Sequence, residues 1–479
     1  MNPHASLPSP HRSDAAAAPS APPAARPPGP PTPWWGLGTM RAMRADYLGF
    51  VTRLQRQHGD VTFMQLVHEQ AYDLFAPELI RQVLVDQHEQ LQRWERGPEV
   101  FAELVGQNVL VTEGATWQRQ RRMLQPGFTP RRVAGYGRLM VDAARHALDM
   151  AVMPGADRAD VDMDALFTRL TMDVILRTLF GAAATARESA DAAWAVKTAN
   201  ATAMREMFWP VTLPDWLPLP GKADKRRAID ILHSLVRRHI ARRQAAPADP
   251  APADDLLAML LAVRDDHGAG LDPQELMDQC LVTFTAGHDT TASALLWWSA
   301  MLAHHPEAAA RAQAEVDALL AGRDPTADDL PQLAWLGATL KETLRLYPPL
   351  GALMTRRTRA PVQAGPWTIP AGALVRISPW VVQRDARWFP DPETFRPERF
   401  LPVDRGGDAP PPRGAWLPFG TGPRVCIGQH FALLEMTLVA AMLLQRYRLA
   451  PISGQPLGAP EMQVTLRPAG GLRLQLSRR

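Results

Sequence analysis

Apolar residues recur at helical spacing along most of this chain, so helices dominate the structure that the sequence predicts. The helical pattern covers residues 47–58, 77–86, 189–207, 222–243, 273–304 and 431–444. Shorter apolar runs between turn residues predict strands at 61–66, 69–75, 362–369 and 373–377. We therefore expect a mainly α fold with a minor β region.

The first 33 residues show neither pattern and contain 11 prolines among many alanines. Such a composition cannot bury a core. We expect a disordered Pro/Ala-rich tail over 1–33 and one folded domain over 34–479. No run reaches the roughly 18 consecutive apolar residues of a membrane span, and no basic segment precedes an apolar run at the N-terminus. We expect neither a transmembrane anchor nor a signal peptide.

The composition argues against several classes of protein. Lys and Arg total 52 against 49 Asp and Glu, and a net charge of +3 over 479 residues is far from the basic excess of a nucleic-acid-binding domain. The two cysteines, Cys280 and Cys426, cannot build a disulfide framework, which fits a reducing compartment. We expect a soluble cytoplasmic monomer that binds no nucleic acid.

Cys426 lies in a glycine-rich turn, Phe419-Gly-Thr-Gly-Pro-Arg-Val-Cys426-Ile-Gly428, directly before a long apolar helical pattern. Glycines allow close backbone approach, and the free N–H groups of a helix start favour a thiolate. A metal bound through sulfur explains this combination, whereas an inert buried thiol is the usual role of a lone cysteine. A dinucleotide loop would need glycine at Val425, and a cysteine protease would need an oriented histidine that no signature provides.

A second unusual segment, Ala286-Gly-His-Asp-Thr-Thr291, stands in the middle of the long helix predicted over 273–304. Glycine in a helix interior costs about 1 kcal/mol relative to alanine. Unpaired hydroxyls and a carboxylate in an apolar helix cost more. A groove for a flat cofactor and dioxygen beside the small residues explains the segment, and a kink in which the threonines bond back to the helix is the alternative.

Two further pairs carry charge at helical spacing. Glu342 and Arg345 share one face of a helix, where they form either a surface ion pair worth under about 1 kcal/mol or a buried network among leucines. Trp117 and Arg121 lie one turn apart. Taken alone, the second pair is also compatible with a solvated basic helix.

The cysteine turn resembles the haem-binding loop of the cytochrome P-450 family, F-x-x-G-x-R-x-C-x-G, at all five fixed positions. Three more family motifs match in order along the chain. They are W-x-x-x-R at 117–121, [AG]-G-x-[DE]-T-[TS] at 286–291 and E-x-x-R at 342–345. The resemblance covers roughly 34–479 and implies the P-450 fold, with haem between the long central helix and the cysteine loop.

The resemblance implies haem b, with the thiolate of Cys426 as the iron ligand. The cofactor-binding residues that it implies are Cys426, Arg424, Trp117, Arg121, Arg356, Phe419, Gly420, Ala286 and Gly287. Trp117, Arg121 and Arg424 would meet the propionates, since arginine bonds a carboxylate in a bidentate way. Arg356 is the expected further propionate ligand, although its neighbour Arg357 leaves the register open.

The resemblance also assigns roles at the other motifs. Thr290 would hold the bound oxygen and its waters, and Asp289 would relay protons from solvent, as catalytic residues. Glu342, Arg345 and Arg399 would form a structural triad that fixes the cysteine loop. The residues expected to line the substrate pocket are Phe284, Ala294, Leu353 and Met354.

The function implied is that of a haem-thiolate monooxygenase, which inserts one oxygen atom from O2 into an apolar organic substrate by hydroxylation or epoxidation. Only 51 residues follow Gly428, too few for a flavin domain, so electrons are expected from a separate ferredoxin or flavodoxin with its reductase. A peroxide-dependent or isomerase-type haem-thiolate enzyme is the first alternative, and a non-enzymatic haem sensor is the second. The intact Asp289–Thr290 pair argues against both, and the sequence leaves the substrate open.

Overall fold

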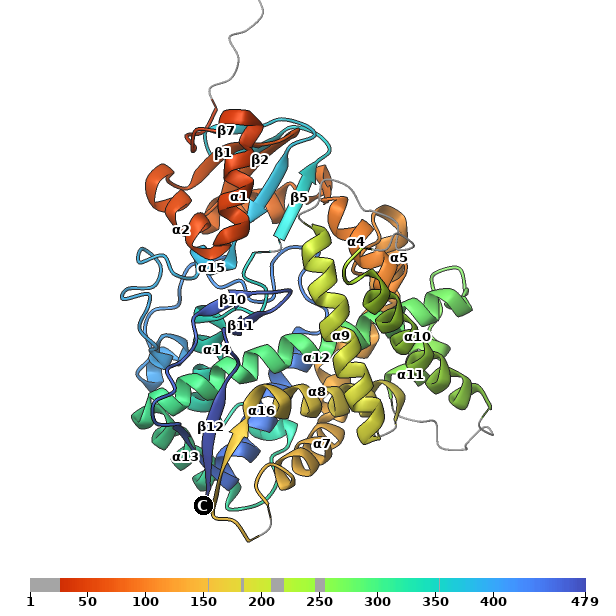
Figure 1. Cartoon of the computed structure of the whole chain (residues 1–479), viewed down its shortest axis with the longest axis vertical. Coiled ribbons are helices and arrows are strands. Elements are labelled where there is room, and N and C mark those ends of the chain that lie inside the picture. Colours follow the sequence, from red (N-terminus) through yellow and green to blue (C-terminus); the bar gives the residue numbers. More distant parts are fainter. Residues whose placement is uncertain (1–25, 154, 182–184, 208–218, 246–254, 353) are drawn as a thin grey trace, which may run out of the picture.

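The computed structural model describes residues 26–153, 155–181, 185–207, 219–245, 255–352 and 354–479. Its main helices are α1 (Leu37–Ala45), α2 (Tyr47–His58), α3 (Pro77–Arg81), α4 (Arg96–Val105), α5 (Gly114–Leu124), α6 (Pro130–Gly135), α7 (Gly137–Asp149), α8 (Met163–Phe180), α9 (Ala186–Met207), α10 (Lys222–Ala245), α11 (Leu256–Ala262), α12 (Pro273–His304), α13 (Pro306–Leu320), α14 (Ala334–Leu346), α15 (Pro379–Val382) and α16 (Gln429–Arg446). Helices form the larger part of the molecule, and a small sheet lies at one end (Figure 1). The expected mainly α fold with a minor β region is confirmed.

The long helix α12 runs through the middle of the helical part (Figure 1), with bounds equal to the predicted ones. Its start is set by a capping box, in which the Asp272 carboxylate accepts from the backbone N–H groups of Gln274 and Glu275 at 2.8 Å. Helices α8, α14, α16 and α10 pack around α12. The first seven residues after its central segment, from Ala292 to Trp298, are all buried. This helix is therefore the core element against which the site is built.

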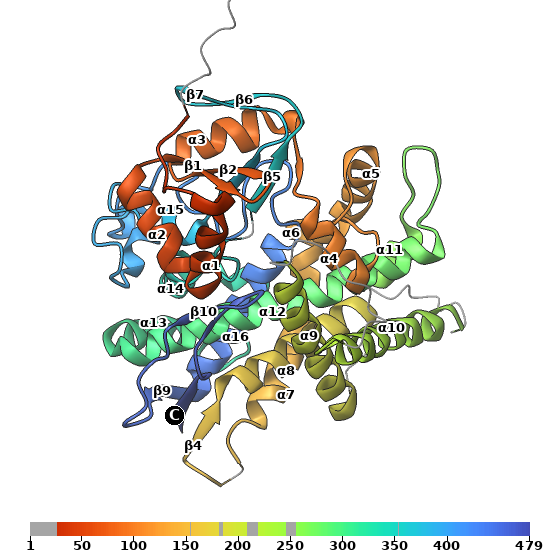
Figure 2. The ribbon, with the colours of Figure 1, turned by 45° about the horizontal axis from the view of Figure 1, so that its top comes forward.

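The largest sheet has five strands in the order β1 (Val61–Leu66), β2 (Glu69–Leu74), β8 (Leu374–Ile377), β5 (Met354–Thr358) and β3 (Leu91–Arg93). Strands β2 and β8 pair in parallel, and the other neighbours are antiparallel. This sheet and helices α1 and α2 form one end of the molecule (Figure 2). It brings segments that are just over 300 residues apart in sequence into direct register, as between Ala71 and Leu374.

Three smaller β structures complete the fold. The segment 362–369 is not one strand, as the sequence predicted, but the hairpin of β6 (Val362–Ala364) and β7 (Trp367–Ile369), because Gly365 turns the chain with φ of 59°. A three-stranded sheet has the order β4 (Arg158–Asp162), β12 (Arg473–Arg478) and β9 (Tyr447–Pro451). The hairpin of β10 (Pro460–Met462) and β11 (Leu466–Pro468) packs on α12.

Other predicted elements agree in place but differ at their ends. Helix α2 matches 47–58, whereas the helix expected over 77–86 is α3 followed by the π-helical turn η2 (Gln82–Asp86). We predicted no bounds for the helices α4 to α8. No helix in the described ranges combines the length and apolar character needed to cross a membrane.

The chain is already packed on the protein before residue 34. The Phe63 N–H donates to the carbonyl of Pro28 at 3.0 Å, and the guanidinium of Arg26 lies 4.8 Å from the Phe63 ring centre. Residues 26–33 therefore belong to the folded part and not to the expected tail. The rest of the expected tail, residues 1–25, lies outside the described residues.

Candidate active site

The cysteine loop closes on itself through backbone hydrogen bonds. The Cys426 N–H donates to the carbonyl of Phe419 at 2.9 Å, and the Val425 N–H donates to that of Gly422 at 3.0 Å. Gly420 and Gly422 have φ of 74° and 75°, in the left-handed region. A Cβ on Gly422 would lie 2.4 Å from the backbone oxygen of Leu84, so only glycine lets the loop pass this close to η2.

The two cysteines differ in their surroundings. Cys280 is fully buried in the core on α12, whereas Cys426 is exposed at the loop that precedes α16. Desolvation raises the pKa of the Cys426 thiol above 9.0, while the N–H of Gly428 and the charge of Arg121 lower it. A cation bound to the sulfur would favour the thiolate, because coordination deprotonates a thiol. The thiolate at Cys426 stays a prediction.

The middle of α12 carries a strip of residues that we call the α12 groove. Thr283, Ala286, Gly287 and Thr290 are more exposed than the buried helix around them, and their i, i+3, i+4, i+7 spacing places them on one face. Ala286 is exposed although it lies near the centre of α12, a helix in which most residues are buried. A strip of small and hydroxyl-bearing residues thus lines an open space within the core.

The threonines and the glycine of this segment have local partners. The Thr290 hydroxyl donates to the Ala286 carbonyl at 3.0 Å, and that of Thr291 donates to Gly287 at 3.1 Å. The back-bonded arrangement that we considered as the alternative is therefore present in addition to the groove. A Cβ on Gly287 would lie 2.9 Å from the Cδ1 of Ile175. Gly287 thus packs closely against α8, and its contact with a cofactor stays a prediction.

Asp289 is held by donors from two other elements. Its Oδ1 accepts from Arg467 on β11 at 2.6 Å, and its Oδ2 accepts from the Thr465 hydroxyl at 3.0 Å and from Asn200 on α9 at 3.4 Å. The neighbouring His288 faces the opposite side, where it is buried, and its Nδ1 lies 3.0 Å from the Phe284 carbonyl oxygen. Burial lowers the pKa of His288 below 6.5, so it is neutral at pH 7.

Two of the residues expected to line the substrate pocket lie in the hydrophobic core. Phe284 and Ala294 belong to the main hydrophobic core, and Phe284 contacts the His288 ring on the side of α12 away from the groove. The structure places both in the core instead of at an accessible pocket, because the helical phase turns Phe284 away by more than a quarter turn. Met354 begins β5, and Leu353 lies outside the described residues.

Four arginines gather beside the cysteine loop, on β3, α5, β5 and the loop itself. They are Arg93, Arg121, Arg356 and Arg424. Burial lowers the pKa of all four, to about 9 for Arg93, where the charges of Arg356 and Arg424 add to the effect, and to about 10 for Arg424. A buried cluster with this excess of positive charge is stable only beside anions.

Glu113 is the one carboxylate found with this cluster among the described residues. It lies 2.7 Å from Arg424, and it accepts from the Arg93 N–H at 3.1 Å. Arg424 also lies 3.9 Å above the ring of Trp117, which brings two predicted residues together. The Nε of Arg93 is buried without a hydrogen-bond partner in the structure. Sequence reasoning missed Arg93, because an isolated arginine in a three-residue strand carries no motif.

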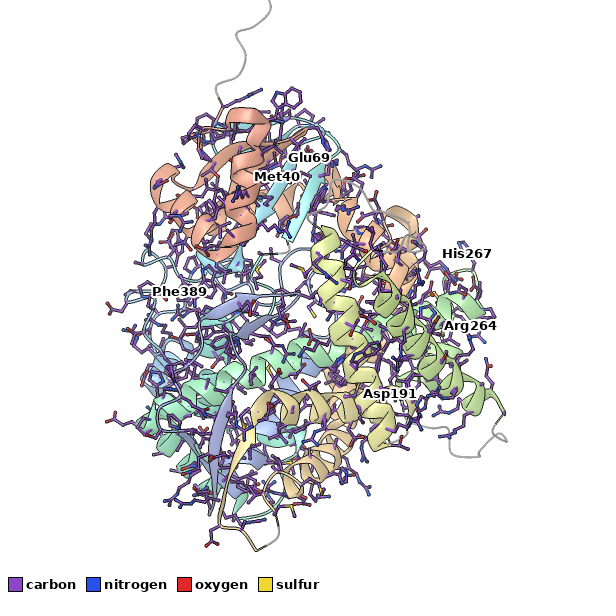
Figure 3. All side chains as sticks on the ribbon, in the orientation of Figure 1. Met40, Glu69, Asp191, Arg264, His267 and Phe389 are labelled. Atoms are coloured by element: carbon purple, nitrogen blue, oxygen red, sulfur yellow. The ribbon has the colours of Figure 1, made fainter. Side chains whose placement is uncertain are left out.

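The structure resolves the choice between the two adjacent arginines of β5. Successive residues of a strand point to opposite faces. Arg356 points to the arginine cluster, whereas Arg357 binds Glu69 on β2 and Glu95 at 2.7 Å each, on the other face. Figure 3 labels Glu69 on this sheet. Arg356 is therefore the one available to an anion at the site.

We expect opposite defects from alanine at these two positions. Arg356→Ala should lower cofactor content by several-fold while the apoprotein keeps its midpoint of urea unfolding, because it removes a charge that faces the site. Arg357→Ala should lower that midpoint, because the free energy of unfolding falls by roughly 1–3 kcal/mol when charged hydrogen bonds are lost. It should leave the cofactor content unchanged. Absorbance of the bound cofactor measures the cofactor content, and urea titration measures the unfolding midpoint. Equal cofactor loss in both variants would contradict the assignment.

The predicted triad is assembled in the core. Arg345 donates to both carboxylate oxygens of Glu342 at 2.7 and 2.8 Å, and Arg399 donates to Glu342 at 3.4 Å. Glu342 and Arg345 are 0% exposed, so the surface-pair alternative is excluded. The Arg345 guanidinium also donates to the carbonyls of Gln383 and Pro392, and its carbon lies 5.1 Å from the ring of Phe389 (labelled in Figure 3).

Gln383 extends this network to the cysteine loop, and sequence reasoning missed it. Its side-chain amide donates to the carbonyls of Leu344 and Arg345, at 3.0 and 2.9 Å. Its side-chain oxygen accepts from the N–H of Leu417 at 2.6 Å, two residues before Phe419. The fully buried Gln383 thus connects the triad helix α14 directly to the chain that enters the cysteine loop.

Below the loop, α16 carries a buried acid, Glu435. Burial raises its pKa well above 4.5, a hydrogen bond with Thr291 opposes this, and its Oε1 has no partner in the structure. The folded state thus keeps a proton that the unfolded state loses above pH 4.5. Stability should fall as pH rises from that value toward the folded-state pKa, by about 1.4 kcal/mol for each pH unit in between.

Glu435→Gln should therefore stabilise the protein at pH 8 and have no effect near pH 4, where both states are protonated. Urea unfolding at a series of pH values measures the difference. Glu461→Gln is the control, since Glu461 is exposed on β10. An equal gain from Glu435→Gln at both pH values would rule out a proton held by this carboxyl.

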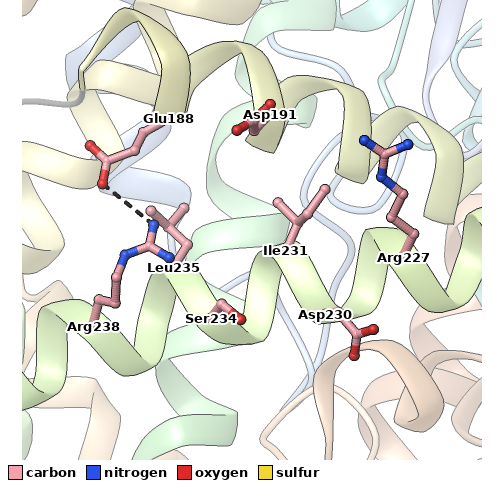
Figure 4. Close-up of a pocket in the computed structure, with 8 residues that line it drawn as sticks. All are labelled: Glu188, Asp191, Arg227, Asp230, Ile231, Ser234, Leu235 and Arg238. Atoms are coloured by element: carbon pink, nitrogen blue, oxygen red, sulfur yellow. Dashed lines mark hydrogen bonds and ion pairs between the residues drawn. The ribbon is translucent and has the colours of Figure 1, made fainter.

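A separate groove of about 250 Å³ lies between α9 and α10 (Figure 4). It is bordered by charged side chains of both signs, and Arg238 reaches Glu188 at 3.5 Å across it. Its lining comes from α9 and α10 alone and includes no residue of the cysteine loop or of the α12 groove. We do not place the active site there.

The residues around the α12 groove fit a haem. The exposed thiol of Cys426 provides a sulfur ligand, and the exposed Ala286 leaves space beside an otherwise buried helix. The arginine cluster, in which the Nε of Arg93 makes no hydrogen bond, provides the charge that two propionates need. A helical fold with a cysteine loop below an Asp–Thr groove defines the haem-thiolate monooxygenases as the class of this protein.

Comparisons with known proteins agree. The family model described as cytochrome P450 matches residues 27–475, and the chain belongs to the cytochrome P-450 family. It is 35% identical to cyclooctat-9-en-7-ol 5-monooxygenase of Streptomyces melanosporofaciens, over 88% of this chain and 89% of that protein. It is 32% identical to pentalenene oxygenase of Streptomyces avermitilis, over 82% of this chain and 84% of that protein.

A solved structure, the retinoic acid bound cyanobacterial CYP120A1, shares the fold. It superposes with a TM-score of 0.80 at 26% identity and covers 95% of this chain and 100% of that one. The family, the fold and the monooxygenase class expected from the sequence are thus confirmed. Haem is the cofactor that the family implies.

Proposed function

We propose that this monooxygenase inserts one atom of O2 into a terpenoid, a largely apolar substrate, by hydroxylation or epoxidation. The observation that carries the proposal is the exposed strip of α12, where small residues stand beside Thr290 and Asp289 in an otherwise buried helix, together with the exposed Cys426. Relatives named for cyclooctat-9-en-7-ol and for pentalenene support the terpenoid class.

The cofactor is haem b, held through the sulfur of Cys426. It supplies the iron at which O2 is activated when both are bound. Arg356 and Arg424 bind the propionates, and Arg93 adds an Nε donor that makes no hydrogen bond in the protein and lies 3.8 Å from Glu113. Trp117 supports Arg424 from below through its ring, and Arg121 contributes its charge near the sulfur.

The chain's own groups handle the protons that oxygen activation consumes. The Thr290 hydroxyl, on the open face of α12, holds a proton and a water at the groove. Asp289, adjacent to it in sequence and partly exposed, takes protons from solvent and passes them toward Thr290. Both residues are fixed by the helix, so the transfer path needs no rearrangement of the backbone.

Electrons come from a separate ferredoxin or flavodoxin with its reductase. The haem domain comprises residues 26–479, as one folded unit that works as a cytoplasmic monomer. We infer that the partner docks beside the cysteine loop, where Pro423 is exposed three residues before Cys426. Glu342, Arg345 and Arg399 hold this loop in place and take no part in turnover.

The test combines binding with product analysis. A panel of terpenes, fatty acids, steroids and aromatic compounds is titrated into the purified protein, and the low- to high-spin shift of the Soret band reports binding. Hits are then incubated with a ferredoxin, its reductase, NADPH and ¹⁸O2. We expect terpenoid hits to gain one ¹⁸O atom. Equal turnover with H2O2 alone, or hits confined to another compound class, would overturn the proposal.

A further inference from the structure

The guanidinium of Arg467 bridges two carboxylates that belong to different helices. Its two terminal nitrogens contact Asp289 in the middle of α12, at 2.6 Å, and Asp164 in the first turn of α8. Arg467 is 12% exposed, whereas Asp289 is 18% and Asp164 is 35% exposed. An arginine this enclosed, shared between two acids, fixes both its own position and that of each carboxylate.

The hairpin that carries Arg467 is fastened to α12 independently of this bridge. The Leu466 carbonyl accepts from the Ser293 hydroxyl at 2.7 Å and from the indole N–H of Trp297 at 2.9 Å. The Leu466 N–H donates to the Pro349 carbonyl at 2.9 Å. The position of Arg467 is thus set by the core of the protein, and the guanidinium is presented to Asp289 by a rigid element.

Around the carboxylate, the donors come from three directions. Thr465, on the same hairpin, donates to Oδ2 of Asp289, and Asn200 of α9 donates to the same oxygen. Arg467 occupies the other oxygen. These three donors orient the carboxylate and leave about one of its four acceptor positions open, on the oxygen that Arg467 contacts, so a proton taken up there competes directly with the bond to Arg467.

We infer that Arg467 is a positioning residue for proton transfer through Asp289, and that Asp164 is its alternate partner during each transfer. When Asp289 takes up a proton, its bond with Arg467 weakens, and Asp164 keeps the guanidinium paired. When Asp289 releases the proton toward Thr290, its bond with Arg467 forms again. This inference rests on the proposed role of Asp289.

The arrangement makes a specific prediction about Asp164, which is remote from the groove. Without Asp164, Asp289 is the carboxylate that remains to Arg467 among the described residues. The bond between Arg467 and Asp289 then tightens and opens less often. Without Arg467, Asp289 loses its orientation, and Asp164 has nothing left to act upon. The effect of Asp164 must therefore pass through Arg467.

The experiment is a double-mutant cycle with Arg467→Gln, Asp164→Asn and both together. Product formation should fall about tenfold in Arg467→Gln, a part of the 10²- to 10⁴-fold effect typical of proton transfer, and by a smaller factor in Asp164→Asn. The solvent deuterium isotope effect on turnover should rise in both. Asp164→Asn should have no further effect in the Arg467→Gln background. Additive losses, or an unchanged isotope effect, would overturn the inference.

Two controls separate this outcome from a structural defect. Every variant is checked for its reduced-CO spectrum and for the substrate-induced Soret shift, both of which should match the wild type. Arg473→Gln on β12 removes an exposed arginine that bonds only a backbone carbonyl, and it should leave all readouts unchanged. Should Arg467→Gln fail to fold, Arg467→Lys keeps the charge but not the two-armed contact, and it should restore only part of the rate.

A failure of the proposed function would give a different result from a failure of the role inferred for Arg467. If wild-type protein forms no oxygenated product with any bound compound, the function is wrong and the cycle is uninformative about turnover. If the wild type turns over and Arg467→Gln equals it in rate and isotope effect, only the role of Arg467 is wrong.

Discussion

Cys426→Ser abolishes the Soret band of the reduced CO complex at the position typical of the family. Serine has no thiolate, and a hydroxyl stays protonated where sulfur would bind iron as an anion. Cys426 is the exposed cysteine of the described chain, at the loop below the α12 groove. We expect complete loss of this band and of turnover, while helix content by circular dichroism stays the same, since the loop is held by backbone hydrogen bonds.

Cys280→Ala is the matched control for this variant. Cys280 is buried in the core, and burial strongly raises the pKa of its thiol. Its replacement should leave the CO band in place and cost only the modest stability of a small cavity. Survival of the band in Cys426→Ser, or its loss in Cys280→Ala, would refute the assignment of the ligand.

Glu342→Ala should have the largest effect on stability. It leaves Arg345 and Arg399 buried without their carboxylate, and breaking a buried ion pair in this way costs about 3–5 kcal/mol. The change should also accelerate haem loss, because Glu342 accepts from the backbone N–H of Arg396, and the network continues through Gln383 to the cysteine loop. Urea unfolding and the rate of haem transfer to apomyoglobin measure the two effects.

Arg81→Ala serves as the control, because its ion pair with Asp86 lies on the surface and should contribute less than about 1 kcal/mol. If Glu342→Ala does not fold, Gln383→Ala tests the same connection more gently. It should keep the fold and still speed haem loss. A Glu342→Ala protein with wild-type stability and haem retention would show that the triad has no structural role.

The local elements were predictable because their causes are local. The apolar periodicity and the Asp272–Pro273 start gave α12 its bounds, and the ends of α2 followed in the same way. Gly365 shows the limit of such reasoning, since a positive φ at one residue divides an expected strand into a hairpin. The motif around Cys426 was equally local, and the resemblance it carries led to the family that the comparisons confirm.

Other features depended on which faces meet in three dimensions. Arg356 and Arg357 are equivalent in sequence, and only the sheet directs one to the arginine cluster and the other to Glu69 and Glu95. Arg93 joins the cluster from a three-residue strand. Phe284 shares a helix with Thr290, but its phase turns it into the core.

The sequence by itself thus determined the bounds of α2 and α12 and the motifs that identify the family, because each rests on residues within a few positions of one another. The tertiary structure alone decided which charges surround the site. The contact between Asp289 and Arg467 joins residues 178 positions apart, and that between Gln383 and Leu417 spans 34. Such pairs leave no periodic trace in a single chain, since they are set by the packing of elements that are distant in the sequence.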